Sequence, residues 1–321
     1  MSRRYINQLT AQETVDQVFL ASEKQLRPNR NGNLYLQLML SDRTGSVNAR
    51  LWNASEGLYK TFENGDYVRV EGTTQLFQGS IQMIATRITR VDPSEIDESD
   101  FTTMSTAEVD RLVVRIGEML RGMDNLSLRN LAECFLLDNE FMEKFSRAPA
   151  GIKNHHAYHG GLLQHTYSLM DLAQRIAPCY PQIDRDLLLT GAFIHDIGKT
   201  DELNYERDLS YSDQGQMLGH LVLSVSILEA KVAEAEKLSG EPIDADTVMR
   251  LKHILISHHG EYEYGSPKLP MTLEAMALSQ LDNLDAKIAS FEQLIRDDPN
   301  VDSSWTGYHQ NLGRKLYKGQ V

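Results

Sequence analysis

Cysteine is scarce in this sequence, and the two that occur, Cys134 and Cys179, lie in apolar stretches without metal-type spacing. Their number excludes a scaffold built on several disulfide bridges, and their spacing excludes a structural zinc site built on cysteine pairs. A reducing compartment suits such a chain, and we therefore expect a cytoplasmic protein.

Long hydrophobic runs are missing as well. No apolar run approaches the roughly 18 residues that span a bilayer, and the basic residues near Met1 have no apolar segment behind them. We therefore expect no membrane span and no signal peptide. The composition is that of a soluble globular protein, with 41% hydrophobic and 24% charged residues, and 321 residues are enough for two domains.

Positive charge is in the minority, because 45 Asp and Glu against 32 Lys and Arg leave a net charge of −13. The charge is unevenly spread. Residues 1–91 carry 11 basic and 8 acidic side chains, a balance of +3, whereas the remainder carries 21 and 37, a balance of −16. A basic front suits contact with a polyanion such as a nucleic acid, and bound metal would neutralise part of the acidity behind it.

The first 91 residues alternate like strands, with turn signals between the segments. The strands are predicted at 15–22, 34–40, 46–52, 67–72 and 81–91, with a polar turn at 27–33 and a short helix near 55–62. Five short strands with one brief helix between the third and the fourth are the plan of an OB-fold β-barrel. We expect this barrel to bind nucleic acid, and residues 92–104 to form an acidic linker.

From Ser105 onward the periodicity is helical, and Ser105 with Glu108 makes a capping-box pattern. Residues 105–298 are therefore expected to form an all-α bundle, and residues 299–321 a basic, aromatic C-terminal tail. The predicted helices are 107–122, 126–137, 139–146, 161–176, 185–198, 217–238, 244–258 and 272–296.

Five histidines and two aspartates each lie on the apolar face of a predicted helix; His165, for example, shares its face with Leu169, Leu172 and Ile176. Any one histidine alone would sooner be an ordinary core residue. Together, however, these side chains are costly to bury without partners, and they are the ligands that divalent metals prefer, placed where a helix bundle builds a metal site. The predicted ligands are His165, His195, Asp196, His220, His258, His259 and Asp282.

Mixed histidine and aspartate ligation without cysteine disfavours a structural zinc site and leaves Mn²⁺, Co²⁺, Mg²⁺, Fe²⁺ and Zn²⁺ open, with Mn²⁺ as our first expectation. Lys199 follows His195 by four residues and Asp196 by three. It is expected on the same helical face, where it would meet a substrate phosphate; the alternative is an ordinary cation at a helix C-terminus.

His165, the His195–Asp196 pair and Asp282 resemble the H…HD…D signature of the HD phosphohydrolase superfamily, whose fold is helical and metal-dependent. The resemblance implies that these four residues hold one ion and that Asp196 bridges to a second. The second ion would be held by His220 and by His258 or His259, of which we favour His258. Two cations bridged by a carboxylate activate water at neutral pH and stabilise phosphate charge, so Asp196 is the expected catalytic centre, with Lys199.

The order of barrel, linker and helical domain resembles the YhaM-type 3′→5′ exoribonuclease family along nearly the whole chain. The motifs are Gly-Gly-Leu-Leu-Gln-His-Thr at 160–166, Phe-Ile-His-Asp-Ile-Gly-Lys at 193–199, Leu-Gly-His at 218–220, His-His-Gly-Glu-Tyr-Glu-Tyr-Gly-Ser-Pro at 258–267 and Leu-Asp-Asn-Leu-Asp-Ala-Lys at 281–287. The resemblance implies a metal-dependent 3′→5′ exonuclease that degrades single-stranded RNA, with single-stranded DNA as a further candidate, to nucleoside 5′-monophosphates. It also implies a homo-oligomer.

Substrate contacts are expected at three places. On the barrel, Tyr35, Trp52 and Phe77 are candidates for stacking on bases, although Trp52 is expected in the core, and the candidate phosphate contacts are Arg43, Arg50, Arg69 and Arg87. The loop after the last histidine pair offers Tyr262, Tyr264 and Lys268. The third place is the glycine-flanked loop before His165, whose histidines are His155, His156 and, as the best candidate, His159.

Two other functions remain open on sequence alone. An HD-type nucleotide phosphohydrolase or cyclic-dinucleotide phosphodiesterase would use the metal site but leaves the barrel without a role. A non-catalytic single-strand-binding replication accessory protein would use the barrel, and its binding would survive substitution of His195 and Asp196 by alanine.

Overall fold

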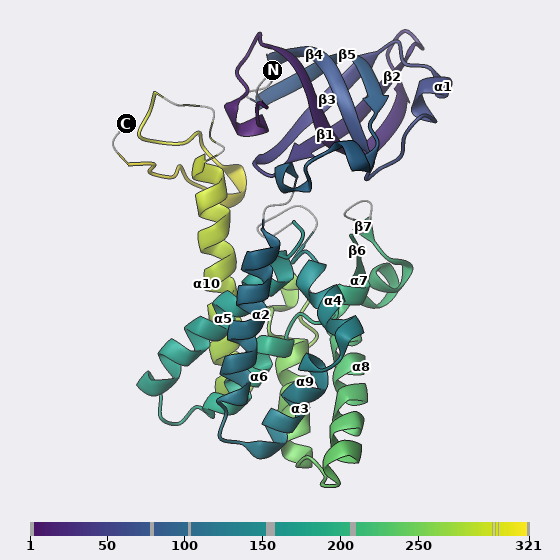
Figure 1. Ribbon diagram of the computed structural model, residues 1–321. Helices are drawn as coiled ribbons and strands as arrows, with labels where there is room; N and C mark the ends of the chain where they lie inside the picture. The colour runs from purple at the N-terminus through teal and green to yellow at the C-terminus, as the bar shows by residue number, and fades with distance from the viewer. Residues whose placement is uncertain are drawn as a thin grey trace. The chain divides into compact units, whose positions relative to one another are not determined.

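The computed structural model describes residues 3–77, 80–101, 104–151, 158–205, 210–296, 298, 300 and 302–319. The chain divides into two compact units, one extending to Ser105 and the other beginning at Thr106 (Figure 1).

The N-terminal unit is a closed five-stranded barrel, as the sequence predicts. Its strands pair in the order β1-β2-β3-β5-β4, and only the β3–β5 contact among these pairs is parallel. A short helix, α1, lies between the third and fourth strands, which is the expected OB-fold plan. The elements are β1 (Thr14–Pro28), β2 (Leu34–Asp42), β3 (Gly45–Trp52), α1 (Glu56–Tyr59), β4 (Tyr67–Phe77) and β5 (Ser80–Arg90).

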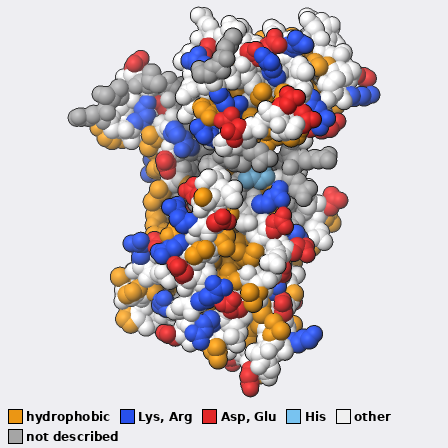
Figure 2. Space-filling view, in the orientation of Figure 1, with side chains coloured by type: hydrophobic (Ala, Val, Ile, Leu, Met, Phe, Trp, Pro, Cys, Tyr) orange, Lys and Arg blue, Asp and Glu red, His pale blue; other side chains and the backbone are white. Residues whose placement is uncertain are grey.

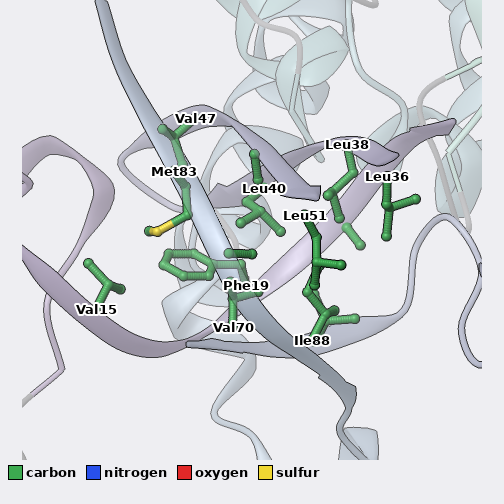
Figure 3. Close-up of a cluster of buried hydrophobic side chains, with 14 of the residues drawn as sticks. Val15, Phe19, Leu36, Leu38, Leu40, Val47, Leu51, Val70, Met83 and Ile88 are labelled. Carbon is green, nitrogen blue, oxygen red and sulfur yellow. The ribbon is translucent and has the colours of Figure 1, made fainter. Parts of the chain in front are cut away.

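Alternation along the strands fills the barrel. In β2, Leu36, Leu38 and Leu40 are fully buried, and the side chains between them are only half-buried. Phe19 from β1 and Met83 from β5 meet these leucines in the interior (Figure 3). A period of two residues therefore sets which face of each strand is left for a ligand.

Strand β1 extends further than predicted, to Pro28 instead of Ser22. A register shift between Ser22 and Gln25 marks a β-bulge, and Glu23 there has a φ of +51°. A bulge changes the phase of the alternation, so the strand continues past the point where the sequence pattern breaks off.

The segment expected as an acidic linker packs against the barrel as far as Phe101. The Tyr5 hydroxyl donates a hydrogen bond to Asp100 at 2.7 Å, and the Arg3 guanidinium lies 3.0 Å from the same carboxylate. The Phe101 ring contacts the Tyr67 ring at a centroid distance of 4.8 Å. These contacts make residues 92–101 part of the barrel unit.

The second unit is the predicted helical bundle, with one small addition, a two-stranded sheet of β6 and β7. Phenylalanine rings from three helices, Phe135, Phe141, Phe145 and Phe193, pack together at its centre. The elements are α2 (Thr106–Arg121), α3 (Leu126–Leu136), α4 (Asn139–Arg147), α5 (Gly161–Ile176), α6 (Arg185–Ile194), α7 (Lys199–Glu202), β6 (Leu203–Asn204), β7 (Ser210–Tyr211), α8 (Asp213–Ser239), α9 (Ala245–Ser257) and α10 (Leu273–Arg296).

Helix α8 is long and apolar enough to cross a membrane by length and composition, with a mean hydropathy of 1.2 over its most apolar window. A single helix of this kind is weak evidence, because core helices pass the same test. Helix α8 packs against α3, α7 and α9, and it is interrupted at Gly219, whose φ of 72° and ψ of 158° are not helical.

The C-terminal tail is folded where it is described. Trp305 pairs with Tyr317 and His309 with Arg314 in isolated antiparallel bridges, so that residues 305–317 double back on themselves. Thr306 and Leu316 are buried, and Lys318 forms an ion pair with Asp298 at 3.0 Å. The basic-aromatic character therefore belongs to a small hairpin at the end of α10 (Figure 1).

Candidate metal centre

Five segments of the helical unit deliver the predicted ligands to one buried region. Helix α5 carries His165, and α10 carries Asp282. The turn after α6 carries His195 and Asp196, α8 carries His220 directly after its interruption, and the end of α9 carries His258 and His259. Their burial is high, with His195 fully buried and His165, Asp196 and His258 at most 3% exposed.

Helix α6 ends at Ile194, four residues earlier than predicted. All of its residues except Arg185 are buried, so it is a central helix that presents His195 and Asp196 at its C-terminal end. The chain then makes a turn, and Lys199 begins the short helix α7. The expected single helical face for His195, Asp196 and Lys199 is thus wrong, although the Lys199 side chain still reaches Asp196.

Gly198 explains the turn. A β-carbon at this position would lie 2.2 Å from the carbonyl oxygen of His220 and 2.7 Å from the backbone nitrogen of Ser224. The Gly198 backbone N–H donates to the Ser224 hydroxyl at 2.8 Å. The turn that carries two ligands is therefore pressed directly onto the helix that carries a third.

We expect Gly198→Ala to lower the free energy of unfolding by about 1–3 kcal/mol, because the added methyl group cannot be accommodated against backbone atoms. Urea denaturation of the metal-free protein measures this change. Gly151→Ala is the matched control, since a β-carbon there meets no heavy atom of the described residues within 4 Å. An equal loss in both variants would contradict the packing argument.

One cluster consists of His165, His195 and Asp282, whose ligand atoms all lie within 4.8 Å of one another. The Nε2 atom of His165 is 3.1 Å from Nε2 of His195 and 3.2 Å from Oδ1 of Asp282. Two imidazole nitrogens and a carboxylate oxygen converging on one point are a donor set for a divalent cation.

The second cluster consists of His220, His258 and His259, again within 4.8 Å of one another. The Nε2 atoms of His220 and His259 are 3.2 Å apart, and the rings of His258 and His259 contact at 4.5 Å. Both members of the adjacent pair therefore reach the cluster, because they follow one another at the end of α9, where the helix gives way to a turn.

Asp196 lies between the two clusters. Its Oδ2 is 3.2 Å from Nε2 of His195, and its Oδ1 is 3.5 Å from Nε2 of both His220 and His258. Oδ1 is buried and has no hydrogen-bond partner among the described residues. A buried carboxylate oxygen is costly to leave without a partner, and a cation shared by the two clusters would satisfy it. The donor set therefore fits divalent metal.

The Nδ1 atoms of the five imidazoles are all engaged on the outer side of the site. His195, His258 and His259 contact the backbone carbonyls of Ala192, Leu255 and Tyr264 at 2.8–2.9 Å. His165 contacts Asp285 at 2.9 Å, and His220 contacts Glu202 at 3.0 Å. Each Nε2 is thereby left to face the centre, which is the orientation that metal-binding histidines take.

Glu202 and Asp285 are functional candidates that the sequence reasoning missed. Asp285 follows Asp282 by three residues and so had a spacing signal. Glu202 lies in a four-residue helix followed by a short strand, where no periodicity marks the inward face.

Oppositely charged side chains in the site lie in close pairs that balance one another. Burial disfavours the charged form of His165, but its hydrogen bonds to Asp282 and Asp285 raise its pKa to about 9. Burial would raise the pKa of Asp196, yet Lys199 and His195 hold it well below its ordinary value. Burial would lower the pKa of Lys199, but Asp196 outweighs this and raises it.

Lys199 contacts both Asp196 in the site and the backbone of Ala150 outside it. Its Nζ atom lies 2.6 Å from Oδ2 of Asp196 and donates a hydrogen bond to the carbonyl of Ala150 at 2.7 Å. The side chain is 16% exposed, so the ammonium group is a fixed cation at the edge of the buried carboxylate.

The loop after α9 is held by its own backbone and by Ser266. The Ser266 hydroxyl donates to the carbonyls of Ile256 and Lys268, while the carbonyl of Tyr264 contacts His259. The Tyr262 and Tyr264 rings remain 63% and 61% exposed, and Lys268 is exposed. The loop thus contacts His259 through its backbone and carries two exposed aromatic rings, those of Tyr262 and Tyr264.

The remaining predicted loop residue, His159, is half-buried, and its ring edge packs against Tyr205 at a centroid distance of 6.5 Å. It belongs to neither of the two clusters formed by the described residues. His155 and His156 lie outside the described residues.

On the barrel, three aromatic rings surround one arginine. The Arg50 guanidinium carbon is 6.0, 5.9 and 5.4 Å from the ring centroids of Tyr35, Trp52 and Phe77. Trp52 is 43% exposed and Phe77 42%. The expectation that Trp52 lies in the core is wrong, because Val47, Ala49 and Leu51 take the inward face of β3 and Trp52 shares the outer face with Arg50.

The other predicted arginines have partners within the barrel unit. Arg69 makes two contacts of 2.6 Å with Asp16, and Arg87 lies 3.7 Å from Glu71. Arg43, in the turn between β2 and β3, stacks over the Tyr5 ring at 4.3 Å. Arg50 is the one that lies among the candidate stacking residues.

The fold and the site together define an OB-fold nucleic-acid-binding domain joined to an HD domain. Residues 20–91 match the family described as OB-fold nucleic acid binding domain, and residues 162–287 match the HD domain family.

Two curated relatives extend over most of the chain. The 3′-5′ exoribonuclease YhaM of Bacillus subtilis is 34% identical over 284 residues, 88% of either protein, and the protein of the same name from Bacillus velezensis is 33% identical over the same coverage. The second OB-fold domain of replication protein A from Methanococcus maripaludis is 22% identical over 28% of this chain and 94% of that domain, with a TM-score of 0.22. This chain belongs to the YhaM family of 3′-5′ exoribonucleases, as the sequence motifs predict, and the HD nuclease family implies dependence on divalent metal.

Proposed function

We propose that this protein is a metal-dependent 3′→5′ exonuclease that degrades single-stranded RNA, with single-stranded DNA as a second substrate, to nucleoside 5′-monophosphates. The observation that carries the proposal is the Asp196 carboxylate. Its Oδ1 has no hydrogen-bond partner among the described residues and lies 3.5 Å from two histidines of one cluster, while Oδ2 contacts the other.

The residues would divide between two ions. His165, His195 and Asp282 would hold one, His220, His258 and His259 would hold the other, and Asp196 would be shared. When bound, such ions supply Lewis acidity and a water of lowered pKa. Mn²⁺ is the ion we propose first, with Co²⁺, Mg²⁺, Fe²⁺ and Zn²⁺ as the other candidates for nitrogen and oxygen donors.

Lys199 and the mouth of the site would position the RNA. The Lys199 ammonium is a fixed cation beside Asp196, and it would neutralise a substrate phosphate. The exposed rings of Tyr262 and Tyr264 would stack on the terminal base, with Lys268 on a phosphate and His159 as a further contact. Stacking tolerates any base, which suits an exonuclease that must process every sequence.

The barrel would capture the single strand. Tyr35, Trp52 and Phe77 offer faces for stacking, and Arg50 among them offers charge to the phosphate backbone. Arg43 would contact the RNA farther from these rings. It lies in the turn that joins β2 to β3, at the end of the two strands opposite to Tyr35 and Trp52, and it stacks over the Tyr5 ring.

We further propose a cytoplasmic homo-oligomer that needs no membrane. The free cysteines Cys134 and Cys179 suit a reducing compartment. Exposed Leu284 and Ile288 lie one turn apart on α10, and hydrophobic side chains gather along this helix in Figure 2. An apolar stripe of this kind supports contact between copies.

The test is a cleavage assay on a 5′-labelled 20-nucleotide single-stranded RNA after chelation and add-back of each candidate ion. We expect a ladder that shortens from the 3′ end, with nucleoside 5′-monophosphate as the product, and no such ladder without metal. Deoxynucleoside triphosphates and cyclic dinucleotides are assayed in parallel. Faster turnover of either would favour an HD-type nucleotide phosphohydrolase, and tight RNA binding without cleavage under any ion would favour a non-catalytic binding protein.

A further inference from the structure

Each of the two clusters contains one imidazole that is backed by a carboxylate, whereas the others are backed by neutral carbonyls. In the first cluster this residue is His165, whose Nδ1 is 2.9 Å from Oδ2 of Asp285. In the second it is His220, whose Nδ1 is 3.0 Å from Oε1 of Glu202. A carboxylate behind a ligating histidine fixes its tautomer and raises its basicity more than a carbonyl does.

We propose that Glu202 and Asp285 are positioning residues, each governing the binding of one of the two metal ions. The inference rests on the two-ion site of the proposed function. It assigns Glu202 to the ion held by His220, His258 and His259, and Asp285 to the ion held by His165, His195 and Asp282.

Contacts of the Glu202 backbone fix its position beside His220. A β-carbon at Gly215 would lie 2.2 Å from the Glu202 carbonyl oxygen, so the first turn of α8 packs directly on the Glu202 backbone. The Ser212 backbone N–H donates to the same carbonyl at 2.9 Å. The Glu202 side chain is 10% exposed, and it points from this anchored backbone to His220.

Because α8 is interrupted, Glu202 also makes a hydrogen bond with the backbone of His220. Because Gly219 is not helical, the His220 backbone N–H begins a new helical segment and needs a capping acceptor. Oε1 of Glu202 accepts from this N–H at 2.9 Å as well as contacting the ring. The carboxylate thus fixes both the backbone and the imidazole of His220, and its Nε2 is directed toward Asp196 at 3.5 Å.

Asp285 holds His165 from the same helix that supplies Asp282. Three residues apart on α10, the two carboxylates face the same side. Asp282 Oδ1 lies 3.2 Å from Nε2 of His165, and Asp285 Oδ2 lies 2.9 Å from its Nδ1. Both nitrogens of the His165 ring thus contact a carboxylate. When a cation takes the place of the contact between Nε2 and Asp282, Asp285 at Nδ1 would still fix the orientation of the ring.

The test measures Mn²⁺ binding to the full chain by titration calorimetry, with electron paramagnetic resonance to separate a coupled ion pair from a single ion. Loss of an outer partner of a metal ligand typically costs about 10–100-fold in affinity. We expect Glu202→Ala to weaken one ion by this factor and Asp285→Ala to weaken the other. Glu202→Gln and Asp285→Asn should weaken the same ions to a smaller extent, because an amide oxygen can accept the same hydrogen bonds but carries no negative charge.

Matched controls come from the same helices. Asp201→Ala removes the neighbouring carboxylate, that of Asp201, which lies 3.4 Å from Lys144. Glu292→Ala removes an exposed acidic side chain of α10. Both should bind two ions with unchanged affinity. In a His220→Ala background, Glu202→Ala should have no further effect, whereas in a His165→Ala background it should.

Two results would overturn the assignment: Glu202→Ala and Asp285→Ala weakening the same ion, or Glu202→Ala binding both ions as tightly as Asp201→Ala. If Glu202→Ala fails to fold, Glu202→Gln decides, since it should weaken one ion selectively while folding normally by circular dichroism. A wild-type protein that binds fewer than two Mn²⁺ ions would instead refute the two-ion site itself.

Discussion

Asp196→Asn is expected to lower the rate of RNA cleavage at saturating Mn²⁺ by about 10³-fold or more, equivalent to the loss of about 4 kcal/mol of transition-state stabilisation. The physical reason is that, among the residues that the structure describes, Asp196 is the one carboxylate with an oxygen directed at each histidine cluster. Asparagine keeps the shape but offers one neutral carbonyl oxygen in place of two anionic ones. Single-turnover cleavage of a 20-nucleotide RNA measures the loss.

The same substitution should destabilise the metal-free protein, because Lys199 loses the carboxylate that lies 2.6 Å from its ammonium group. Breaking a buried ion pair by removing one partner typically costs about 3–5 kcal/mol. Asp196→Asn/Lys199→Met removes both partners and should recover much of the unfolding free energy in urea, yet remain inactive. Recovery of cleavage in the double variant, or more than one-tenth of the wild-type rate in Asp196→Asn, would contradict this role for Asp196.

Much of the metal site could be predicted because helical periodicity constrains direction. His165 shares a face with Leu169, four residues on, and Asp282 shares one with Leu278, four residues before, and both leucines are fully buried. What periodicity could not supply was the position where a helix ends. His195 lies beyond the last residue of α6, and the turn there depends on the close approach of Gly198 to α8, a contact between segments more than 20 residues apart.

Glu202 escaped prediction for a related reason. It lies in a segment of short elements, where there are too few residues for a pattern to emerge, and its role depends on the non-helical backbone of Gly219 in another helix. The segment 92–101 shows the same limit, since its acidic composition suggested a linker and only three-dimensional contacts pair Asp100 with Arg3 and Tyr5.

Trp52 is a different case, because the information was present in the sequence. Along β3 the residues in phase with Trp52 are Asn48 and Arg50, whereas Val47 and Leu51 occupy the opposite phase. A side chain that alternates with apolar neighbours and aligns with polar ones belongs on the outer face. The size and hydrophobicity of Trp52 favoured a place in the core, but its phase along β3 indicates the outer face.

That outer face should dominate binding of long RNA. Base stacking on an aromatic side chain is worth about 1–3 kcal/mol per base, so Tyr35→Ala/Trp52→Ala is expected to weaken binding of a 20-nucleotide single-stranded RNA by about 100-fold. Arg50→Ala should weaken it less and reduce its salt dependence, since that residue offers charge instead of a ring. Binding is measured with the inactive Asp196→Asn protein by fluorescence anisotropy, so that the RNA remains intact.

Trp305 provides the matched control, because it is the second of the two tryptophans in the chain and is 50% exposed in the helical unit. Trp305→Ala should leave RNA affinity unchanged, and Trp305→Phe makes Trp52 the single tryptophan, whose emission should be quenched as RNA binds. Neither barrel ring lies in the core, so unfolding free energies should change by no more than about 0.5 kcal/mol. Undiminished RNA affinity in the double barrel variant would place strand capture elsewhere.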